Sequence, residues 1–456
     1  MNLEVVILAA GQGTRMYSDI PKVLHDLGGK PLLAHVLAVA RSLQAQGIHI
    51  VYGHGGEQVR ERVDDGSANW VMQEEQLGTA HAVMQALPHV GADTLALVLY
   101  GDVPLIQLDT LRRLVLAAGE GTLALLTVEL ADPRGYGRII RDSADRVVKI
   151  VEEKDASAEE LDVKEINTGF LAIPASKLKA WVAGVDNDNA QGEYYLTDVA
   201  AAAVREGYGI STCKPNTSWE VVGVNNKAQL AQLERAYQQR RAHALMLQGV
   251  TLRDPARFDL RGELEAGRDV VIDANVLMEG KVVLGDGVRI GPNNVIRDSF
   301  IGAGTVILPN CVIEESELGK NCQIGPFARL RAGPRVADGA KIGNFVEIKK
   351  SDIGAGSKIN HLSYVGDTTV GKNVNIGAGT ITCNYDGANK YRTIIEDNVF
   401  IGSDTQLVAP VTVGEGATIG AGSTIIKDAP AGELTLSRAA QKTRRGWKRP
   451  VKKRKP

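Results

Sequence analysis

Apolar residues in the second half of the chain recur at every sixth position. The run begins with Ile272, Met278, Leu284, Ile290 and Ile296. After occasional five-residue steps the same spacing returns and continues to Ile425. A six-residue apolar period is typical of a β-helix, in which each hexad forms one short strand and one turn and three hexads close a triangular coil. We therefore predict a parallel β-helix over residues 250–456, with aliphatic side chains stacked along its axis and glycine or small residues at its corners.

One polar segment, Thr380–Asn398, interrupts the six-residue count and carries a turn at Asp386–Gly387. An excursion from a solenoid usually lies on one face and often binds a ligand. The alternative is an insertion that the fold tolerates without using it. The sequence leaves both interpretations open.

The first half of the chain has a different pattern, in which short apolar runs alternate with segments of helical spacing. The apolar runs, which predict buried strands, are Glu4–Gly11, His49–Gly56, Thr94–Leu105 and Thr122–Leu130. The segments of helical spacing are Leu32–Leu43 and Gly78–Leu87. Repeated β-α-β units form a parallel sheet covered by helices on both faces. We therefore predict an α/β, Rossmann-like domain with a mostly parallel sheet, whose ligands bind outside the carboxyl ends of the strands.

A long helix is predicted between the two patterns. The segment Asn225–Gly249 lacks proline, has no glycine before its end, and places leucines and a tyrosine at helical spacing. The predicted organisation is therefore an α/β domain over residues 1–225, a helical linker over 226–249, and a β-helix with a basic tail over 250–456.

Composition adds limits on the class of protein. With 456 residues, 44% of them apolar, the chain can bury the cores of two or three domains. Its four cysteines form no C-x-x-C pair, so we expect reduced thiols rather than disulfides or a zinc site. The N-terminal apolar run is too short for a signal peptide, and no stretch is long enough to cross a membrane. We therefore expect a cytoplasmic protein without membrane insertion.

The net charge of −2 conceals a basic C-terminus. Residues 439–456 hold nine Lys and Arg residues and no acid. Such a tail is usually a solvated, mobile end, and contact with an anionic ligand is the alternative. We expect no nucleic-acid partner.

A glycine-rich turn, GQGTRM at residues 11–16, follows the first apolar run. It is close to a dinucleotide fingerprint, but methionine stands where the third glycine belongs. It is not a P-loop, because the second glycine is followed by Thr-Arg rather than by Lys and Ser or Thr. Glycines let backbone N–H groups approach a phosphate closely, and Arg15 and Lys22 add fixed positive charge. The combination favours a bound triphosphate whose charge is neutralised during phosphoryl transfer.

Asp102 follows another buried run, in the stretch LYGDVPL. A lone aspartate at such a place is most often a helix cap or a turn residue. Near a phosphate-binding loop it is instead a natural Mg²⁺ ligand, because Mg²⁺ is held by one or two protein oxygens plus phosphates. The glycine-rich turn favours the metal.

The β-helical half holds a single histidine after residue 243, namely His361 in SKINHLSYVGD. A hexapeptide enzyme with a catalytic zinc ion needs several histidines, so metal-dependent hydrolysis is disfavoured. One histidine is enough for acyl transfer to an amine, where a general base takes the proton of the attacking nitrogen. The alternative is a structural histidine at a coil corner.

Several motifs occur in the order of a known family. They are LAAGQGTRM, PKVL, EQLGTAHAV, LYGDVPL, GYGRI, INTGF and NAQGEYYLTD, followed by the hexapeptide repeats. Over essentially its whole length the chain resembles the bifunctional bacterial N-acetylglucosamine-1-phosphate uridylyltransferase/glucosamine-1-phosphate acetyltransferases. The resemblance implies a nucleotidyltransferase domain joined by a long helix to a left-handed β-helix. It also implies two reactions. Acetyl-CoA acetylates glucosamine 1-phosphate, and the product then reacts with UTP to give UDP-N-acetylglucosamine and pyrophosphate.

In the first domain the resemblance assigns residues to a nucleotide, a metal ion and a sugar. Arg15 and Lys22 would be catalytic residues that act on the phosphates, while Asp102 and Asn225 would hold Mg²⁺. Residues that would contact UTP or its sugar product are Leu8, Ala9, Ala10, Gly11, Tyr100 and Gly101. Residues that would read the uracil, whose two acceptors and one donor match an amide and backbone groups, are Gln73, Gly78 and Thr79. Residues that would bind the amino sugar are Gly137, Glu152 and Asn167.

Two of these assignments have a plainer alternative. Asn225 is placed to cap the long helix, and it can serve both roles. Glu152 lies in a charged turn, VEEKD, where a solvated acid is usual.

In the β-helix the resemblance makes His361 the general base and lets Glu347 orient it, as in other base-plus-orienter pairs. The residues that would bind glucosamine 1-phosphate are Arg331, Lys349, Tyr364 and Asn375. The residues that would line the acetyl-CoA site are Ala378, Asn384, Tyr385, Ser403, Ala421 and Arg438. Lys390 would reach a neighbouring subunit, because acyltransferases of this fold are generally homotrimers with sites between subunits.

Two other functions stay open at this point. One is a single-activity sugar-nucleotide pyrophosphorylase whose β-helix only oligomerises or regulates, and the other is a non-catalytic assembly subunit. His361, the Asn384–Tyr385 excursion and Arg438 favour the bifunctional enzyme. The intact set of Arg15, Lys22 and Asp102 disfavours a non-catalytic role.

Overall fold

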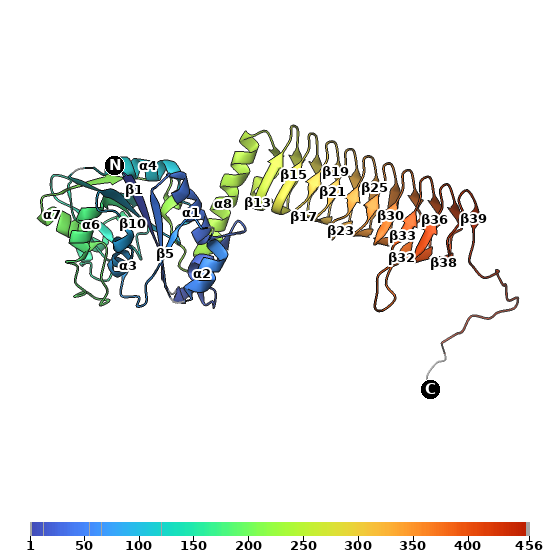
Figure 1. Cartoon of the computed structure of the whole chain (residues 1–456), viewed down its shortest axis with the longest axis horizontal. Helices are drawn as coiled ribbons and strands as arrows, with labels where there is room; N and C mark the ends of the chain where they lie inside the picture. The colour runs from blue at the N-terminus through green and yellow to red at the C-terminus, as the bar shows by residue number, and fades with distance from the viewer. Residues whose placement is uncertain (1, 12, 54, 65, 120, 453–456) are drawn as a thin grey trace. The chain divides into compact units, whose positions relative to one another are not determined.

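The computed structural model describes residues 2–11, 13–53, 55–64, 66–119 and 121–452. It divides into two compact units, residues 1–240 and 241–456, and the division falls within the helix α8 (Lys227–Leu247). Figure 1 shows an α/β unit in blue and green and a coil of short strands in yellow to red.

The first unit is built around a nine-stranded sheet. Its strands are β1 (Asn2–Ala9), β4 (Gly47–Tyr52), β5 (Asn69–Met72), β6 (Thr94–Tyr100), β7 (Thr122–Glu129), β8 (Arg138–Arg141), β9 (Val147–Val151), β10 (Glu165–Pro174) and β11 (Gly209–Cys213). The order is β11-β7-β10-β6-β1-β4-β5, with β8 and β9 attached through β10. β1 pairs in parallel with β4 and β6, which confirms the predicted β-α-β units and mostly parallel sheet. β10 is antiparallel to β6 and β7, which the sequence pattern did not indicate.

Helices cover both faces of this sheet, because β1 is apolar on both sides. Val5 and Ile7 pack with helices α1 (Leu32–Ser42), α2 (Gly56–Val63) and α4 (Leu108–Ala117). Val6 and Leu8 pack on the opposite face with α3 (Thr79–Ala86), α6 (Ala175–Val182) and α7 (Asp198–Arg205). Successive side chains of a strand point to opposite faces of the sheet, so a continuous apolar run must be covered on both faces. The short helix α5 is Ala158–Leu161.

The connecting segments around the glycine-rich turn are short and packed under α8. They include the 3-10 turns η1 (Thr14–Met16) and η2 (Lys22–Leu24) and the small hairpin β2 (Asp26–Leu27) and β3 (Lys30–Pro31). Met16 and Leu27 are buried with Leu233 and Tyr237 of α8. The other 3-10 turns are η3 (Leu87–His89), η4 (Ser218–Val221) and η5 (Pro255–Arg257).

The second unit is a left-handed parallel β-helix. One face is an 11-stranded parallel sheet. Its strands are β12 (Thr251–Leu252), β14 (Val271–Ile272), β16 (Arg289–Ile290), β19 (Val306–Ile307), β22 (Gln323–Ile324), β25 (Lys341–Asn344), β28 (Lys358–His361), β31 (Asn375–Ile376), β34 (Phe400–Ile401), β37 (Thr418–Ile419) and β39 (Leu434–Thr435).

The other two faces form one 17-stranded sheet that folds around a corner. Its strands are β13 (Phe258–Ala266), β15 (Val276–Leu284), β17 (Val295–Arg297), β18 (Phe300–Ile301), β20 (Val312–Glu314), β21 (Glu317–Leu318), β23 (Arg329–Arg331), β24 (Arg335–Val336), β26 (Glu347–Lys349), β27 (Asp352–Ile353), β29 (Tyr364–Gly366), β30 (Thr368–Val370), β32 (Ile381–Cys383), β33 (Thr393–Ile395), β35 (Gln406–Val408), β36 (Val411–Val413) and β38 (Thr424–Ile425).

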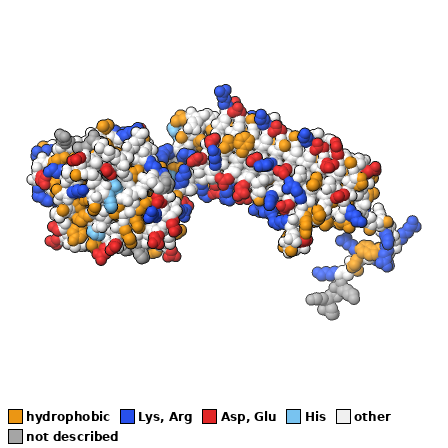
Figure 2. All heavy atoms as spheres, viewed as in Figure 1, with side chains coloured by type: hydrophobic (Ala, Val, Ile, Leu, Met, Phe, Trp, Pro, Cys, Tyr) orange, Lys and Arg blue, Asp and Glu red, His pale blue; other side chains and the backbone are white. Residues whose placement is uncertain are grey.

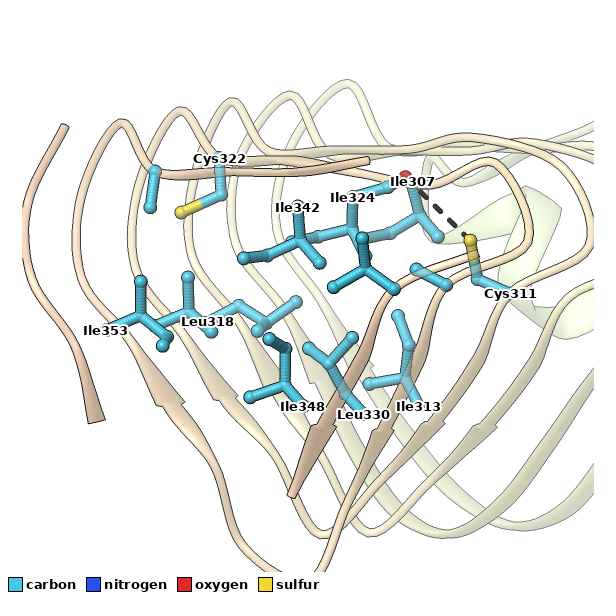
Figure 3. Close-up of a cluster of buried hydrophobic side chains, with 14 of the residues drawn as sticks. Ile307, Cys311, Ile313, Leu318, Cys322, Ile324, Leu330, Ile342, Ile348 and Ile353 are labelled. Atoms are coloured by element: carbon cyan, nitrogen blue, oxygen red, sulfur yellow. Dashed lines mark hydrogen bonds between the residues drawn. The ribbon is translucent and has the colours of Figure 1, made fainter. Parts of the chain in front are cut away.

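The six-residue apolar positions fill the axis of the coil, as predicted. Ile324, Leu330 and Ile342 are all fully buried, and Figure 3 shows such side chains converging from the three faces. Neighbouring coils pair at a step of 17 or 18 residues, as in Ile307 with Ile324 and Ile324 with Ile342. A 17-residue coil contains one of the five-residue steps seen in the sequence. Stacking of like side chains on neighbouring coils gives each residue the same apolar surroundings.

Buried hydroxyl groups connect successive coils at the corners. The Ser299 hydroxyl accepts the backbone N–H of Ser316, and the Ser351 hydroxyl accepts that of Thr368. These bonds satisfy backbone donors that the tight corners leave out of the strand ladders. They explain why small polar residues, as well as glycine, recur between the apolar positions.

The predicted excursion forms a loop between β32 and β33. Ile376 pairs with Ile401, a step of 25 residues, so this coil is longer than its neighbours. The extra residues project from the coil as a loop that is visible between β32 and β33 in Figure 1. Among the described residues, no helix is both long and apolar enough to cross a membrane. The four cysteines are unpaired, as expected.

Candidate active sites

A cavity of about 560 Å³ lies at the carboxyl ends of β1 and β6. The predicted nucleotide residues that line it are Leu8, Ala9, Ala10, Gly11, Lys22, Gln73, Gly78, Thr79, Tyr100, Asp102 and Asn225. Segments far apart in the sequence therefore meet at one edge of the sheet. This edge is where ligands bind in open α/β sheets.

The glycine-rich turn reaches the cavity because its second glycine adopts a left-handed conformation. Gly13 has φ 64°, and a Cβ atom there would lie 2.7 Å from the Cβ of Lys22. The turn can therefore lie directly against Lys22 only if residue 13 has no side chain. Gly11, Gly13 and Lys22 therefore line the same cavity. Gln12 lies outside the described residues.

Asp102, Asn225 and two cations form a compact cluster, of which Asp102, Asn225 and Lys22 line the cavity. The Lys22 ammonium forms an ion pair with Asp102, and its Nζ lies 3.5 Å from Oδ1 of Asn225. Arg15 donates to the same Oδ1 at 3.2 Å. The Val224 N–H donates to the Asp102 carbonyl at 3.0 Å, which brings the start of α8 beside β6. A carboxylate and an amide oxygen thus converge where a cation is already accommodated, a donor set that suits Mg²⁺.

The segment from the end of β5 to the start of α3 carries the residues predicted to read a base. Gln73 is buried, and its amide nitrogen donates to the Gly78 carbonyl at 3.3 Å. Gly78 has φ 118°, and a Cβ there would lie 2.5 Å from the Tyr194 carbonyl oxygen. The Thr79 hydroxyl accepts the Leu196 N–H at 3.0 Å. These contacts fix the α3 end of the cavity against the segment NAQGEYYL.

The three predicted sugar residues lie together beside this cavity rather than among its lining residues. The Asn167 N–H donates to the Gly137 carbonyl at 2.8 Å. A Cβ on Gly137 would lie 3.4 Å from both carboxylate oxygens of Glu152. Glu152 accepts a hydrogen bond from Thr197 at 3.1 Å and lines a second cavity of about 350 Å³.

Glu152 is not the solvated turn residue that its charged neighbours suggested. Burial raises the pKa of Glu152, and the carboxylates of Asp198 and Asp155 raise it further. Burial also raises the pKa of Tyr100, with the charges of Glu152 and Asp102 adding to the effect. Tyr100 therefore stays a neutral phenol between the sugar cluster and Asp102. Gly101 donates its N–H to the Leu8 carbonyl at 2.9 Å and holds β6 against β1.

The cavity has further lining residues that the sequence interpretation left out. They are Gly13, Thr14, Val23, Gln76, Ala82 and Glu193. Gln76 and Glu193 belong to the motifs EQLG and NAQGEYY, so a signal for them was present in the sequence. Their neighbours were assigned and they were not, because polarity alone does not show which side of a loop faces a ligand.

In the β-helix, His361 is exposed and is the last residue of β28, where the chain enters a corner of the coil. Its Nδ1–H donates to Oδ1 of Asn344 at 2.7 Å, on the preceding coil. This bond fixes the neutral tautomer whose Nε2 carries a lone pair. The Glu347 carboxylate accepts instead from Nε of Arg331 at 2.6 Å. The orienting contact that was predicted for Glu347 is therefore made by Asn344.

A column of charged side chains on the coil changes from alternating signs to two neighbouring positive charges, an arrangement that suits an anion. Along one column of neighbouring coils the side chains are Arg261, Glu279, Arg297, Glu314, Arg331 and Lys349. The signs alternate up to Arg331, and Arg297 pairs with Glu279 and with Glu314 at 3.1 Å. Arg331 and Lys349 are the first neighbours of like charge. Figure 2 shows that acidic and basic side chains are otherwise intermingled on the visible face of the coil.

Tyr364 lies in the column of Glu347, one coil further on. A Cβ on Gly366 would lie 2.4 Å from the Tyr364 hydroxyl, so the ring lies across that glycine. Asn375 is on the preceding face and pairs with Lys358. The four residues predicted to bind glucosamine 1-phosphate thus lie on two faces that meet at the corner of His361.

A column of small residues continues from His361 along the coil. The register of β28 with β31 places Ala378 beside His361, and the next two coils bring Ser403 and Ala421. Backbone bonds join the column, with the Asp404 N–H donating to Ala378 at 2.7 Å and the Gly422 N–H to Ser403 at 2.8 Å. Arg438 donates to the Ala421 carbonyl at 2.9 Å. The column forms a smooth strip that begins at the histidine.

The excursion begins at Asn384, which is buried and donates to Asp367 through its side-chain amide. Tyr385 is exposed, and its hydroxyl donates to the Gly387 carbonyl at 2.6 Å. At the other end of the loop, Arg392 pairs with Asp352 at 2.8 Å. Both ends of the loop are therefore fixed to the coil.

The two sites and their folds define a two-domain transferase, with a nucleotidyltransferase unit and a hexapeptide β-helix. Residues 5–252 match the family model of MobA-like NTP transferase domains. Residues 392–427 match the model of the bacterial transferase hexapeptide, which spans six repeats. A solved nucleotidyl transferase from Methanothermobacter thermautotroptrophicus is 17% identical with a TM-score of 0.39, covering 52% of this chain and 99% of its own.

Curated relatives match over the whole chain. Bifunctional protein GlmU of Azoarcus sp. (strain BH72) is 62% identical over 452 residues, which are 99% of this chain and 100% of the relative. Bifunctional protein GlmU of Nitrosospira multiformis is 58% identical over 455 residues, with 100% and 99% coverage. The chain belongs to the family of bifunctional GlmU proteins. It is a bifunctional enzyme that acetylates glucosamine 1-phosphate and uridylylates N-acetylglucosamine 1-phosphate, so the single-activity and non-catalytic alternatives fall away.

Proposed function

We propose that uridylyl transfer takes place in the cavity of the first unit. Leu8–Gly11, Tyr100 and Gly101 hold the nucleotide, Gln73, Gly78 and Thr79 read the uracil, and Gly137, Glu152 and Asn167 bind the amino sugar. The observation that carries this proposal is the meeting of the glycine-rich turn, Lys22, Asp102 and Asn225 in one cavity. Positive charge and backbone N–H groups there match a triphosphate.

In this reaction a phosphate oxygen of N-acetylglucosamine 1-phosphate attacks the α-phosphorus of UTP. The new P–O bond forms as the bond to the β-phosphate oxygen breaks, and pyrophosphate leaves. Lys22 and Arg15 stabilise the negative charge that spreads over the phosphoryl oxygens. Asp102 and Asn225 would hold Mg²⁺, which supplies a Lewis acid for the same charge. The Lys22 ammonium pairs with Asp102 in the structure and would pair with a phosphate of the bound nucleotide.

We propose that acetyl transfer takes place at the corner of His361. Arg331, Lys349, Tyr364 and Asn375 hold glucosamine 1-phosphate, with the two like-charged side chains on its phosphate. Asn344 keeps the His361 proton on Nδ1, so Nε2 can take a proton from the substrate amine. The amine nitrogen forms a bond to the thioester carbonyl carbon, the C–S bond breaks, and coenzyme A leaves as the thiol after gaining a proton.

The acetyl-CoA strip is the column of Ala378, Ser403 and Ala421, with Arg438 at its far end and Asn384 and Tyr385 on the excursion. This assignment is supported by the course of the strip, which starts at His361 and runs along the coil over small side chains. An extended pantetheine arm can lie along such a strip with its thioester at the histidine.

We also propose a cytoplasmic homotrimer in which Lys390 of the excursion reaches a neighbouring subunit. Phe327 and Phe345 support association, because both rings are about half exposed and stack at 5.1 Å beside the His361 corner. Apolar rings so placed are unusual on a free surface. Light scattering coupled to gel filtration tests the stoichiometry, and a monomeric mass for the active enzyme would exclude the trimer.

Two substitutions test the assignment of each reaction to its own site. Lys22→Ala should abolish uridylyl transfer and leave acetyl transfer intact, while His361→Ala should do the reverse. Each reaction is assayed separately, the first by pyrophosphate release and the second by thiol release. If His361→Ala acetylates glucosamine 1-phosphate at the normal rate, the general-base assignment is wrong.

A further inference from the structure

Gln73 forms part of the cavity wall, yet its side-chain amide is held from within the protein. The side chain is 2% exposed. Its Nε2 lies 3.3 Å from the Gly78 carbonyl oxygen and 2.9 Å from Nδ1 of His81. A carbonyl oxygen can only accept a hydrogen bond, so the amide nitrogen must be the atom that faces Gly78.

Both hydrogens of that nitrogen are therefore used inside the protein. One is donated to the Gly78 carbonyl and the other to the lone pair on His81 Nδ1. The amide has one further polar atom, Oε1, which can only accept. Gln73 can offer a ligand in the cavity this acceptor and no donor.

His81 supports this orientation without lining the cavity itself. Because its Nδ1 accepts from Gln73, the neutral ring carries its proton on Nε2. Nε2 lies 3.1 Å from the amide nitrogen of Gln85, which also donates to the His81 carbonyl at 3.3 Å. A proton on Nε2 therefore requires the half-buried Gln85 amide to give up that bond and turn its oxygen toward the ring. The ring also packs against Tyr194, at a centroid distance of 6.5 Å. His81 is thus fixed on both sides of the ring.

A wall that offers an acceptor distinguishes the two pyrimidine bases. Uracil carries a hydrogen on N3, whereas N3 of cytosine carries a lone pair. The oxygen of Gln73 can accept the N3–H of uracil, and the same oxygen repels the lone pair of cytosine. A site built around a hydrogen bond rejects an analogue that leaves its polar group unpaired.

We propose that His81 is a positioning residue that makes the enzyme select UTP over CTP, by holding the Gln73 amide with its oxygen toward the base. The inference rests on the proposed function, in which Gln73 reads the uracil. Loss of the His81 acceptor leaves the amide with the longer contact to Gly78 alone. Turning the amide over, which presents its NH₂ group to cytosine N3, then costs only this longer contact and places Oε1 against the Gly78 carbonyl.

The test compares kcat/KM for UTP and for CTP in the full-length enzyme. His81→Phe keeps a ring against Tyr194 and removes the acceptor, and we expect the UTP:CTP ratio to fall about tenfold, the effect of one hydrogen bond. His81→Asn restores an acceptor near the position of Nδ1 and should recover most of the ratio. His81→Leu removes ring and nitrogens together and should resemble the Phe variant. Thermal unfolding of the first unit reports whether each variant is folded, because acetyl transfer takes place in the other unit.

A merely structural role for His81 would lower both values of kcat/KM and leave their ratio unchanged, which would overturn the inference. Gln73→Ala separates this failure from failure of the proposed function. If Gln73→Ala lowers the UTP:CTP ratio and His81→Phe does not, Gln73 reads the base and the role of His81 is wrong. If neither changes the ratio, the uracil assignment of Gln73 is wrong as well. Wild-type enzyme should also reject N3-methyluridine triphosphate, because the methyl group replaces the hydrogen that Oε1 accepts.

Discussion

Replacing Asn344 with alanine removes the oxygen that accepts the Nδ1–H of His361. The bond is 2.7 Å long and lies at an exposed corner, so its net contribution is that of an ordinary hydrogen bond, about 0.5–1.5 kcal/mol. If the hydrogen bond serves to hold His361 in its active tautomer, losing it should decrease the acetyl-transfer kcat by about 2- to 12-fold. Removal of the base itself in His361→Ala should cost far more, about 10²- to 10⁴-fold.

The assay measures initial rates of thiol release from acetyl-CoA at saturating glucosamine 1-phosphate. Glu347→Gln is the matched variant, because Glu347 contacts Arg331 in the structure and not His361. We expect it to change KM for glucosamine 1-phosphate and to leave kcat within about twofold, as for an exposed ion pair. The reasoning is refuted if Glu347→Gln lowers kcat tenfold or more while Asn344→Ala leaves it unchanged.

Four further outcomes follow from the geometry. Lys22→Met should lower uridylyl-transfer kcat about 10²-fold or more by removing a charge from the transition state, with unchanged acetyl transfer as the control. Chelation of divalent cations should abolish uridylyl transfer and spare acetyl transfer, and equal loss of both would contradict the metal assignment. Ile348→Ala should destabilise the β-helix by about 2–5 kcal/mol in denaturant unfolding, since Ile348 is fully buried. Burial raises the pKa of Glu152, so the folded state binds its proton more tightly and stability falls as pH rises above the ordinary value of 4.5. Glu152→Gln should remove that decrease in the melting temperature of the first unit, and an unchanged slope would count against a buried carboxyl.

The β-helix and the α/β sheet could be predicted because both follow from spacing. Neither a helix nor an ordinary strand can bury a six-residue apolar period. The same spacing therefore predicts both the β-helix and the residues that fill its core. Apolar runs such as β1 likewise require cover on both faces. The antiparallel strand β10 could not be predicted, because a fully buried run has the same pattern in either direction.

The first site could be predicted in its parts but not in its connections. Glycines, cations and Asp102 each indicate phosphate or metal chemistry on their own. Nothing in the sequence shows that Val224 donates to the Asp102 carbonyl, yet this bond brings Asn225 to the cluster from more than a hundred residues away. The sugar residues were harder, since Glu152 is polar in a polar turn and only the fold leaves it half-buried.

The register of the coil explains why Asn344, and not Glu347, contacts His361. A strict count of three hexads places His361 opposite Gly343, a residue that has no side chain to orient it. The coil is shorter, because Ile348 and Ile353 are five residues apart and both are buried on the axis. That single missing residue moves the pairing to Asn344. Glu347 precedes the short step and lies on the next face in β26, where it accepts a hydrogen bond from Arg331. In a solenoid the partner of a catalytic side chain is set by the local length of one coil. A chemical motif therefore identifies the base, and only the register identifies the residue that positions it.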